Sequence, residues 1–117
     1  MNLCIPVDEA GQVGHGWGRA ASVALATLSD AAQVVTWEVH PVGWDVLHGE
    51  GSEGSHHARI VRFLREHQVD GVVVEHMGLG MRRVMHAMGI PVFTGAAGDA
   101  RAALEAAARV LTDSPAP

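Results

Sequence analysis

The sequence predicts an α/β protein in which a mixed β-sheet carries helices on both faces. Three observations predict this class. Three strand-like runs come first, helical patterns then alternate with short apolar runs, and residues 70–91 pass from a buried strand through a glycine turn into an amphipathic helix. Consecutive strands pair antiparallel and strands joined by a helix pair in parallel, so we expect an antiparallel opening extended by parallel crossovers.

The first half of the chain is predicted to supply three strands and two loops. Strands are expected at residues 3–7, 22–28 and 33–39, and residues 29–32 read as a hairpin between the last two. Residues 11–18 contain four glycines, which favour a loop that approaches another group closely. Residues 40–55 are polar and glycine-rich, and we predict a mobile loop there.

The second half alternates helices and strands. Ser52 or Ser55 can cap a helix whose buried face holds Ile60, Phe63, Leu64 and His67. A strand at 71–75, a helix at 79–88 ended by Gly89, a strand at 92–93 and an alanine-rich helix after residues 98–99 follow. We expect residues 1–112 to form a single domain and residues 113–117 to be a frayed tail.

Composition restricts the class of function. No apolar run approaches the roughly 20 residues of a membrane span, and the N-terminus lacks the basic and apolar regions of a signal peptide, so we expect a soluble cytoplasmic protein without a membrane partner. All eight basic residues are arginine, against 13 acidic residues and a net charge of −5. Without a broad basic surface, nucleic-acid binding is disfavoured.

Cysteine use disfavours thiolate chemistry. The one cysteine, Cys4, cannot form an internal disulfide, and alone it cannot supply the thiolates that usually hold an iron-sulfur cluster or a structural zinc. Because it lies within an apolar strand, we predict a buried and inert thiol.

Eight histidines in 117 residues are the compositional peculiarity of the chain. Neutral imidazole is the commonest metal ligand, so His15 on the glycine-rich loop and His76 at the tip of a predicted strand are candidate metal ligands. His56 and His57 begin a helix, where the helix dipole favours neutral imidazole. Adjacent helical residues point about 100° apart, so we expect at least one of this pair on the surface, and their roles stay open.

Arg19 and the glycines that precede the 79–88 helix are candidates for binding an anion. A guanidinium keeps its charge and offers forked donors to an anionic ligand, although a structural salt bridge from Arg19 to Asp8 or Glu38 is the alternative. Gly78 and Gly80 would let the first N–H groups of the helix face a ligand above the sheet, and their alternative is tight packing.

Several motifs of the sequence resemble those of a known family. The chain resembles the dinitrogenase iron-molybdenum cofactor biosynthesis family, which includes NifX, the C-terminal part of NifB and small stand-alone relatives. The resemblance covers about residues 1–111. It is carried, in order, by IPVDE, by the HGWGRA motif at residues 15–20, by a loop with glycine and histidine, and by VDGVVVEHMGLGMRRVMHAMGIPV.

The resemblance implies a fold and a set of site residues. Family members look like three-layer ribonuclease H-like folds with a five-stranded mixed sheet (β-β-β-α-β-α-β-α). With the positions singled out above, the predicted cofactor-binding residues are His15, Arg19, His76, Met77, Gly78 and Gly80, with His15 and His76 as metal ligands. The Met77 side chain is expected in the core rather than as a thioether ligand.

Two departures from the family pattern lie in these motifs. Trp17, preceded by Gly16, stands where relatives usually have phenylalanine, and a large aromatic ring still occupies the place. Glu75 and His76 stand where relatives commonly have two glycines, so a carboxylate and an imidazole lie where the open end of an α/β sheet normally receives a ligand. Either the site has gained metal-binding character or the relatives' ligand no longer fits.

These observations together predict a binding or carrier protein without a catalytic residue. The expected ligand is an iron-sulfur cluster or an iron-molybdenum cofactor precursor, and the expected partners are metallocluster donor and acceptor proteins, with a homo-oligomer possible. One alternative is a regulatory or scaffold domain that acts through protein contacts, for which an exposed Trp17 or Trp44 would suit a partner surface. Another is a ribonuclease H-like metal-dependent nuclease that uses Asp8 and Glu75, although a third carboxylate is hard to find.

Overall fold

A computed structural model describes residues 1–113 and contains a five-stranded mixed sheet of order β3-β2-β1-β4-β5. The strands are β1 (Asn2–Val7), β2 (Ser22–Leu28), β3 (Val34–His40), β4 (Gly71–Val73) and β5 (Val92–Phe93). β1 to β3 pair antiparallel, whereas β4 pairs in parallel with both β1 and β5. The predicted mixed sheet is therefore confirmed. Of the predicted tail, residue 113 belongs to the last helix and the rest lies outside the described residues.

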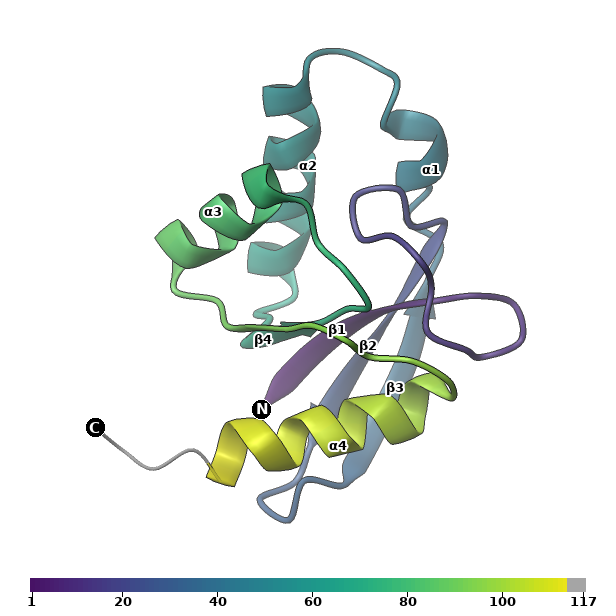
Figure 1. The fold of residues 1–117 in the computed structure, drawn as a ribbon, viewed down its shortest axis with the longest axis vertical. Helices are drawn as coiled ribbons and strands as arrows, with labels where there is room; N and C mark the ends of the chain where they lie inside the picture. Colours follow the sequence, from purple (N-terminus) through teal and green to yellow (C-terminus); the bar gives the residue numbers. More distant parts are fainter. Residues whose placement is uncertain (114–117) are drawn as a thin grey trace.

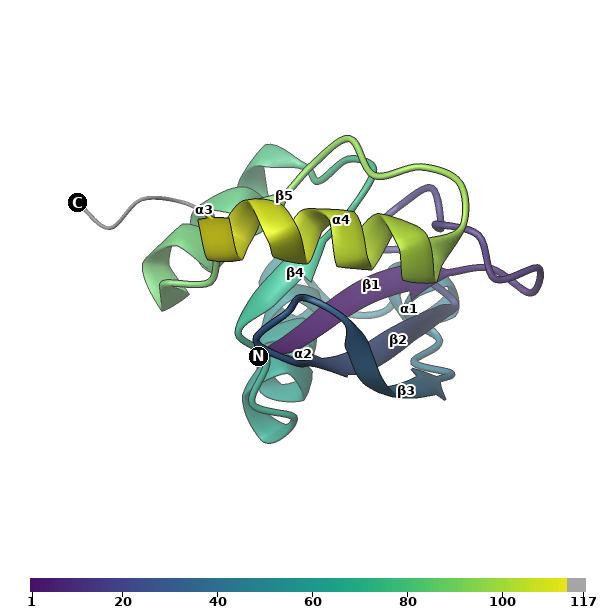
Figure 2. The same ribbon diagram turned by 90° about the horizontal axis from the view of Figure 1, so that it is seen from below.

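Four helices cover the two faces of the sheet in the described part of the chain. They are α1 (Trp44–Leu47), α2 (Glu53–Glu66), α3 (Leu79–Met88) and α4 (Ala100–Asp113). Figure 2 shows α4 lying along one face of the sheet, with α1 and α2 beyond the other face. Within residues 1–113, no helix is both long enough and apolar enough to cross a membrane.

The alternating side chains of β1 explain why both faces need a cover. Leu3 and Ile5 are fully buried in the core beneath α4, whereas Cys4, between them, is fully buried in the second core with side chains of α2 and α3. Successive strand residues point to opposite faces, so a strand that is apolar throughout requires a helical layer on each side. Burial raises the pKa of the Cys4 thiol, which agrees with the inert thiol predicted from sequence.

Local signals in the sequence located the ends of several elements correctly. The Ser52 hydroxyl accepts a hydrogen bond from the Ser55 N–H at 3.1 Å and caps α2, and Gly89 ends α3 with a φ of 71°. Both are short-range arrangements that depend on a few neighbouring residues. They were therefore readable without knowledge of the tertiary structure.

The prediction of a loop throughout residues 40–55 was wrong in part, because α1 lies within it. Trp44 begins α1, is 2% exposed and packs its ring edge-to-face against both Trp17, at 5.2 Å between ring centroids, and Phe63, at 5.5 Å. A single helical turn is too short to be stable by its own propensity. Burial of the indole against residues distant in sequence stabilises α1.

Candidate functional site

Three segments meet beyond the carboxyl ends of β1 and β4, on the side of the sheet that α1 and α2 cover (Figure 1). They are the loop after β1, the start of α2 and the loop that leads from β4 into α3. Together with α1's C-cap they form a cleft of about 320 Å³, which we call the histidine cleft. It is lined by Gly16, Trp17, Gly18, Arg19, His48, Glu53, His56, His57, His76, Gly78, Gly80 and Met81.

The position of the histidine cleft follows from the sheet topology. β1 pairs antiparallel with β2 on one side and in parallel with β4 on the other. The loops that follow β1 and β4 therefore start at the same end of the sheet and diverge there. Ligands commonly bind at such a point in an open α/β sheet. The fold places the predicted anion-binding residues at this edge.

Arg19 is exposed and makes no hydrogen bond or ion pair with any residue between 1 and 113. Neither acid of the alternative salt bridge reaches it. The Asp8 carboxylate accepts backbone N–H groups in its own turn, and the Glu38 carboxylate lies 3.8 Å from His40. The guanidinium at the cleft is therefore not neutralised by a carboxylate within these residues.

The start of α3 leaves open space in front of its N–H groups. Gly78 is the N-cap of this ten-residue helix, has no capping side chain, and a Cβ added there would meet no atom within 4 Å. A Cβ at Gly80 would instead lie 3.2 Å from the His57 ring. Tight packing thus explains Gly80 but not Gly78, whose missing side chain leaves the positive end of the helix dipole accessible from the cleft.

His56 holds the wall of the cleft rather than facing a ligand. Its side chain is 3% exposed, Nε2 lies 2.6 Å from the Gly18 carbonyl oxygen, and Nδ1 lies 2.8 Å from the Arg59 guanidinium. A carbonyl can only accept and a guanidinium can only donate. These partners assign a neutral ring in which Nε2–H donates and Nδ1 accepts. Both nitrogens are therefore occupied.

Three other imidazoles line the cleft with nitrogens that make no hydrogen bond within the described residues. They are His48 after α1, His57 on α2 and His76 after β4. Nε2 of His57 lies 3.8 Å from the Glu53 carboxylate, and its side chain is 22% exposed. Partial desolvation, followed by the positive charge of Arg19, lowers the pKa of His48 from its ordinary value, which favours the neutral form that binds metals.

Of the pair His56 and His57, His56 is buried and His57 keeps 22% of its side chain exposed, and both line the cleft. The first turn of α2 packs between the Gly18 carbonyl and Gly80, which gives each of the two adjacent rings its own partner although they point in different directions. The sequence signal for His48 and His57 was only the high number of histidines. Their common location could not be read from it.

His15 lies outside the histidine cleft. Its side chain is 91% exposed, and Nδ1 lies 3.2 Å from the Glu75 carboxylate. It lines an adjoining groove of about 870 Å³ that shares Gly16 and Arg19 with the cleft. Met77 is 2% exposed within the core, as expected for its side chain. Of the six residues predicted from sequence, the fold brings Arg19, His76, Gly78 and Gly80 together in one cleft.

The described side chains of the cleft do not form a ready-made metal site. Among residues 1–113, no group of three or more histidine, cysteine, aspartate or glutamate side chains is arranged to hold a metal ion. A single ion therefore finds no set of three such ligands within these residues.

Comparison with known proteins identifies the family. Residues 1–110 match the family described as "Dinitrogenase iron-molybdenum cofactor". The chain belongs to this family. The match confirms the resemblance drawn from the sequence motifs, and it associates the chain with nitrogenase cofactor biosynthesis and with a cofactor-binding or carrier role.

Two solved structures share the fold of this dinitrogenase cofactor family member. The crystal structure of PH0822 aligns with a TM-score of 0.72 and 21% identity over 92% of this chain and 90% of that one. The NMR structure of a Thermotoga protein, described as a proposed NifB protein of the DUF35 family, aligns with a TM-score of 0.66 and 19% identity over 92% and 87%. No curated protein sequence matches the chain.

Proposed function

We propose that the protein binds an anionic metallocofactor in the histidine cleft and carries it between donor and acceptor proteins without transforming it. The cofactor would be an iron-sulfur cluster or an iron-molybdenum cofactor precursor. One observation carries the proposal: an arginine without a carboxylate partner, the open start of α3 and three imidazoles line the same cleft. Family membership supports the same class of ligand.

The lack of a ready-made group of three ligands among the described side chains favours a cluster over a single ion. A single zinc or iron ion needs several ligands that converge at about 2 Å, and this convergence does not occur among the described side chains. A multinuclear cluster presents several metal atoms, so individual imidazoles around the cleft can each meet a different one. Its negative charge would be offset by Arg19 and by the first N–H groups of α3.

The donor set also suits exchangeable binding. The one cysteine is fully buried on β1, so the cleft has no thiolate with which to enclose a cluster. Imidazole and amide contacts hold iron less tightly than a four-cysteine site does, which is useful to a carrier that must release its ligand. His76 is the proposed primary ligand, and His15 at the neighbouring groove would become a ligand only if its loop moved toward the cleft.

Anaerobic reconstitution with iron and sulfide tests the proposal. We expect the wild-type protein to acquire cluster absorption, His76→Ala to lose most of it, and Arg19→Ala to bind at least about tenfold more weakly because a charged contact is lost. Arg65→Ala is the matched control, because Arg65 is an exposed arginine on α2 that does not line the cleft. Equal affinity of the Arg19 and Arg65 variants would contradict the assignment.

A protein-interaction role is the second candidate, and the edge strand β3 is the observation in its favour. β3 exposes Val35 by 65% and Val39 by 54% at the edge of the sheet. The expected contribution of exposed tryptophans was wrong, since Trp17 and Trp44 are each 2% exposed. Sedimentation analysis with wild type and Val39→Glu tests this role. A change of mass between the two would favour it.

The nuclease alternative finds no comparable support. The Asp8 carboxylate serves its own turn, and Glu75 pairs with His15, so neither is combined with a third carboxylate among the described residues. We also propose that the fold is ribonuclease H-like and that the protein is located in the cytoplasm.

A further inference from the structure

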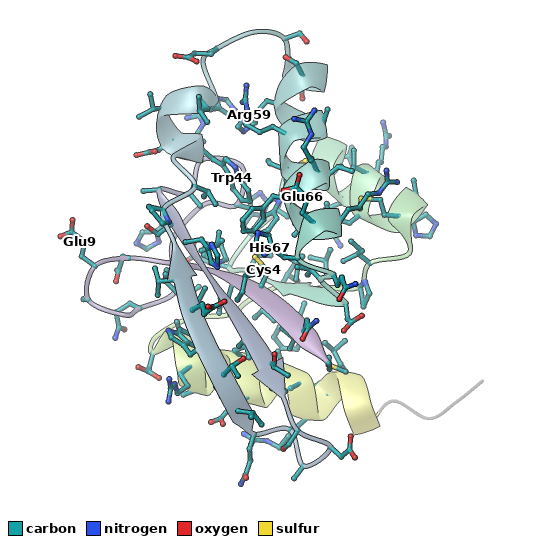
Figure 3. The ribbon with its side chains drawn as sticks, turned by 180° about the vertical axis from the view of Figure 1, so that it is seen from behind. Cys4, Glu9, Trp44, Arg59, Glu66 and His67 are labelled. Atoms are coloured by element: carbon teal, nitrogen blue, oxygen red, sulfur yellow. The ribbon has the colours of Figure 1, made fainter. Side chains whose placement is uncertain are left out.

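A third cavity lies between the second half of α2 and the segment that runs from β3 into α1, and it shares no lining residue with the histidine cleft. We call it the aromatic pocket. Its volume is about 360 Å³, within the range of small-molecule sites. Pro41, Val42, Trp44 and Phe63 form its apolar lining, and Arg59 and Arg62 contribute charge. Figure 3 shows Arg59 between α1 and α2, with Trp44 between Arg59 and the sheet.

The polar groups of the aromatic pocket are mostly cationic or lack a partner. The Arg59 guanidinium donates only to neutral acceptors, the Leu47 carbonyl at 3.3 Å and His56 Nδ1 at 2.8 Å. Arg62 makes no hydrogen bond or ion pair within residues 1–113, and Glu66 is the one carboxylate among the lining residues. The lining therefore includes two guanidinium groups and one carboxylate.

His40 adds an unsatisfied polar atom at the same wall. Its Nε2 is buried and makes no hydrogen bond within the described residues, and the nearest carboxylate oxygen, from Glu38, is 3.8 Å away. A buried polar atom without a partner is unusual in a folded protein. Because this atom is buried, it lies beneath the pocket wall and is not itself a contact for a ligand.

We propose that the aromatic pocket is a binding site for a small organic carboxylate with an apolar body. The apolar body would lie against Phe63, Val42 and the edge of Trp44, and the carboxylate would accept hydrogen bonds from Arg62 and from the free N–H groups of Arg59. This composition, a mostly apolar lining with a few convergent polar groups, is that of small-molecule sites in general. The forked donors of arginine select a carboxylate over a neutral group.

The aromatic pocket is also in physical contact with the histidine cleft. Arg59 is hydrogen-bonded to His56, which is hydrogen-bonded to the Gly18 carbonyl of the cleft. The Trp17 ring of the cleft packs edge-to-face on Trp44. A carboxylate that draws on Arg59 therefore acts on a residue that helps to hold the wall of the cleft. The site itself does not depend on the identity of the ligand in the cleft.

The three tryptophans of the chain report on three cavities, which makes the test specific. Trp44 lines the aromatic pocket and Trp17 lines the histidine cleft. Trp37 lines the groove of about 870 Å³ that also contains His15. We suggest titrating the ¹⁵N-labelled protein with 3-phenylpropanoate and following the three assigned indole N–H signals. The expected result is a saturable shift of Trp44 with a Kd of about 1 mM or tighter, while Trp37 stays unchanged.

Two comparisons decide whether the carboxylate is recognised. The neutral 3-phenylpropanamide should bind about tenfold more weakly, and Arg62→Gln should lose about the same factor for the carboxylate while leaving amide binding unchanged. Arg65→Gln, on the same helix but outside the pocket, is the control. The proposal is overturned if Trp44 does not shift up to about 10 mM, if Trp37 shifts in its place, or if carboxylate and amide bind equally.

Discussion

Removal of the His56 imidazole tests whether this buried ring holds the cleft wall. In His56→Ala the Gly18 carbonyl loses the Nε2–H donor at 2.6 Å, and the Arg59 guanidinium loses an acceptor at 2.8 Å. A neutral hydrogen bond contributes about 1 kcal/mol and one to a charged group about 1.5–3 kcal/mol. We therefore expect the free energy of unfolding to fall by about 3 kcal/mol, a large part of the 5–15 kcal/mol of a typical domain.

His57→Ala is the matched control on the neighbouring residue. Its Nε2 lies 3.8 Å from the Glu53 carboxylate, a contact four residues away on the exposed start of α2, so we expect a loss below about 0.5 kcal/mol. His56→Gln keeps a donor that can reach the Gly18 carbonyl but loses the acceptor for Arg59, and its loss should lie between those of the two alanine variants.

Urea unfolding followed by tryptophan fluorescence measures all three variants, because buried Trp17 and Trp44 report on this region. If His56→Ala and His57→Ala differ by less than about 0.5 kcal/mol, the two hydrogen bonds of His56 do not stabilise the fold and the reasoning fails.

Three further predictions follow from other features of the molecule. Gly78→Ser should leave the free energy of unfolding unchanged or slightly higher, because serine caps a helix and its Cβ meets no atom within 4 Å. The same variant should weaken cofactor binding, because the serine side chain fills part of the cleft. Unchanged binding would contradict this. The Cys4 thiol should react with a disulfide reagent only after unfolding, since it is fully buried and its pKa is raised; rapid reaction of the native protein would refute its burial. His48 should titrate below its ordinary pKa, and Arg19→Gln should raise that pKa, whereas Arg65→Gln should not; NMR titration of the imidazole measures both.

The sign of the His48 effect on stability follows from the lowered pKa. The unfolded chain takes up the proton more readily than the folded protein does. The contribution of this group to stability is therefore fully present above the ordinary pKa of histidine and is lost as the pH falls from that value through the lowered pKa of the folded protein.

The candidate site was predictable to the extent that its residues lie at strand ends. Arg19, His76, Gly78 and Gly80 follow β1 and β4, and the parallel pairing of those two strands brings them to one sheet edge. His15 also follows β1, but its loop carries the imidazole outward to Glu75, away from the cleft. The direction of a side chain on a glycine-rich loop depends on partners that sequence spacing does not specify.

The amino-acid sequence by itself determined the order and type of the main elements, the cap of α2 at Ser52, the end of α3 at Gly89 and the family, because these depend on periodicity, on neighbouring residues and on motif order. Only the tertiary structure decided that α1 exists, that Trp17 and Trp44 are buried against each other, and that His56 is a hydrogen-bonded wall while His48 and His57 line the cleft. The physical reason is that burial and hydrogen-bond partners are set by contacts between residues far apart in the chain, which become fixed only when the sheet and its helices pack together.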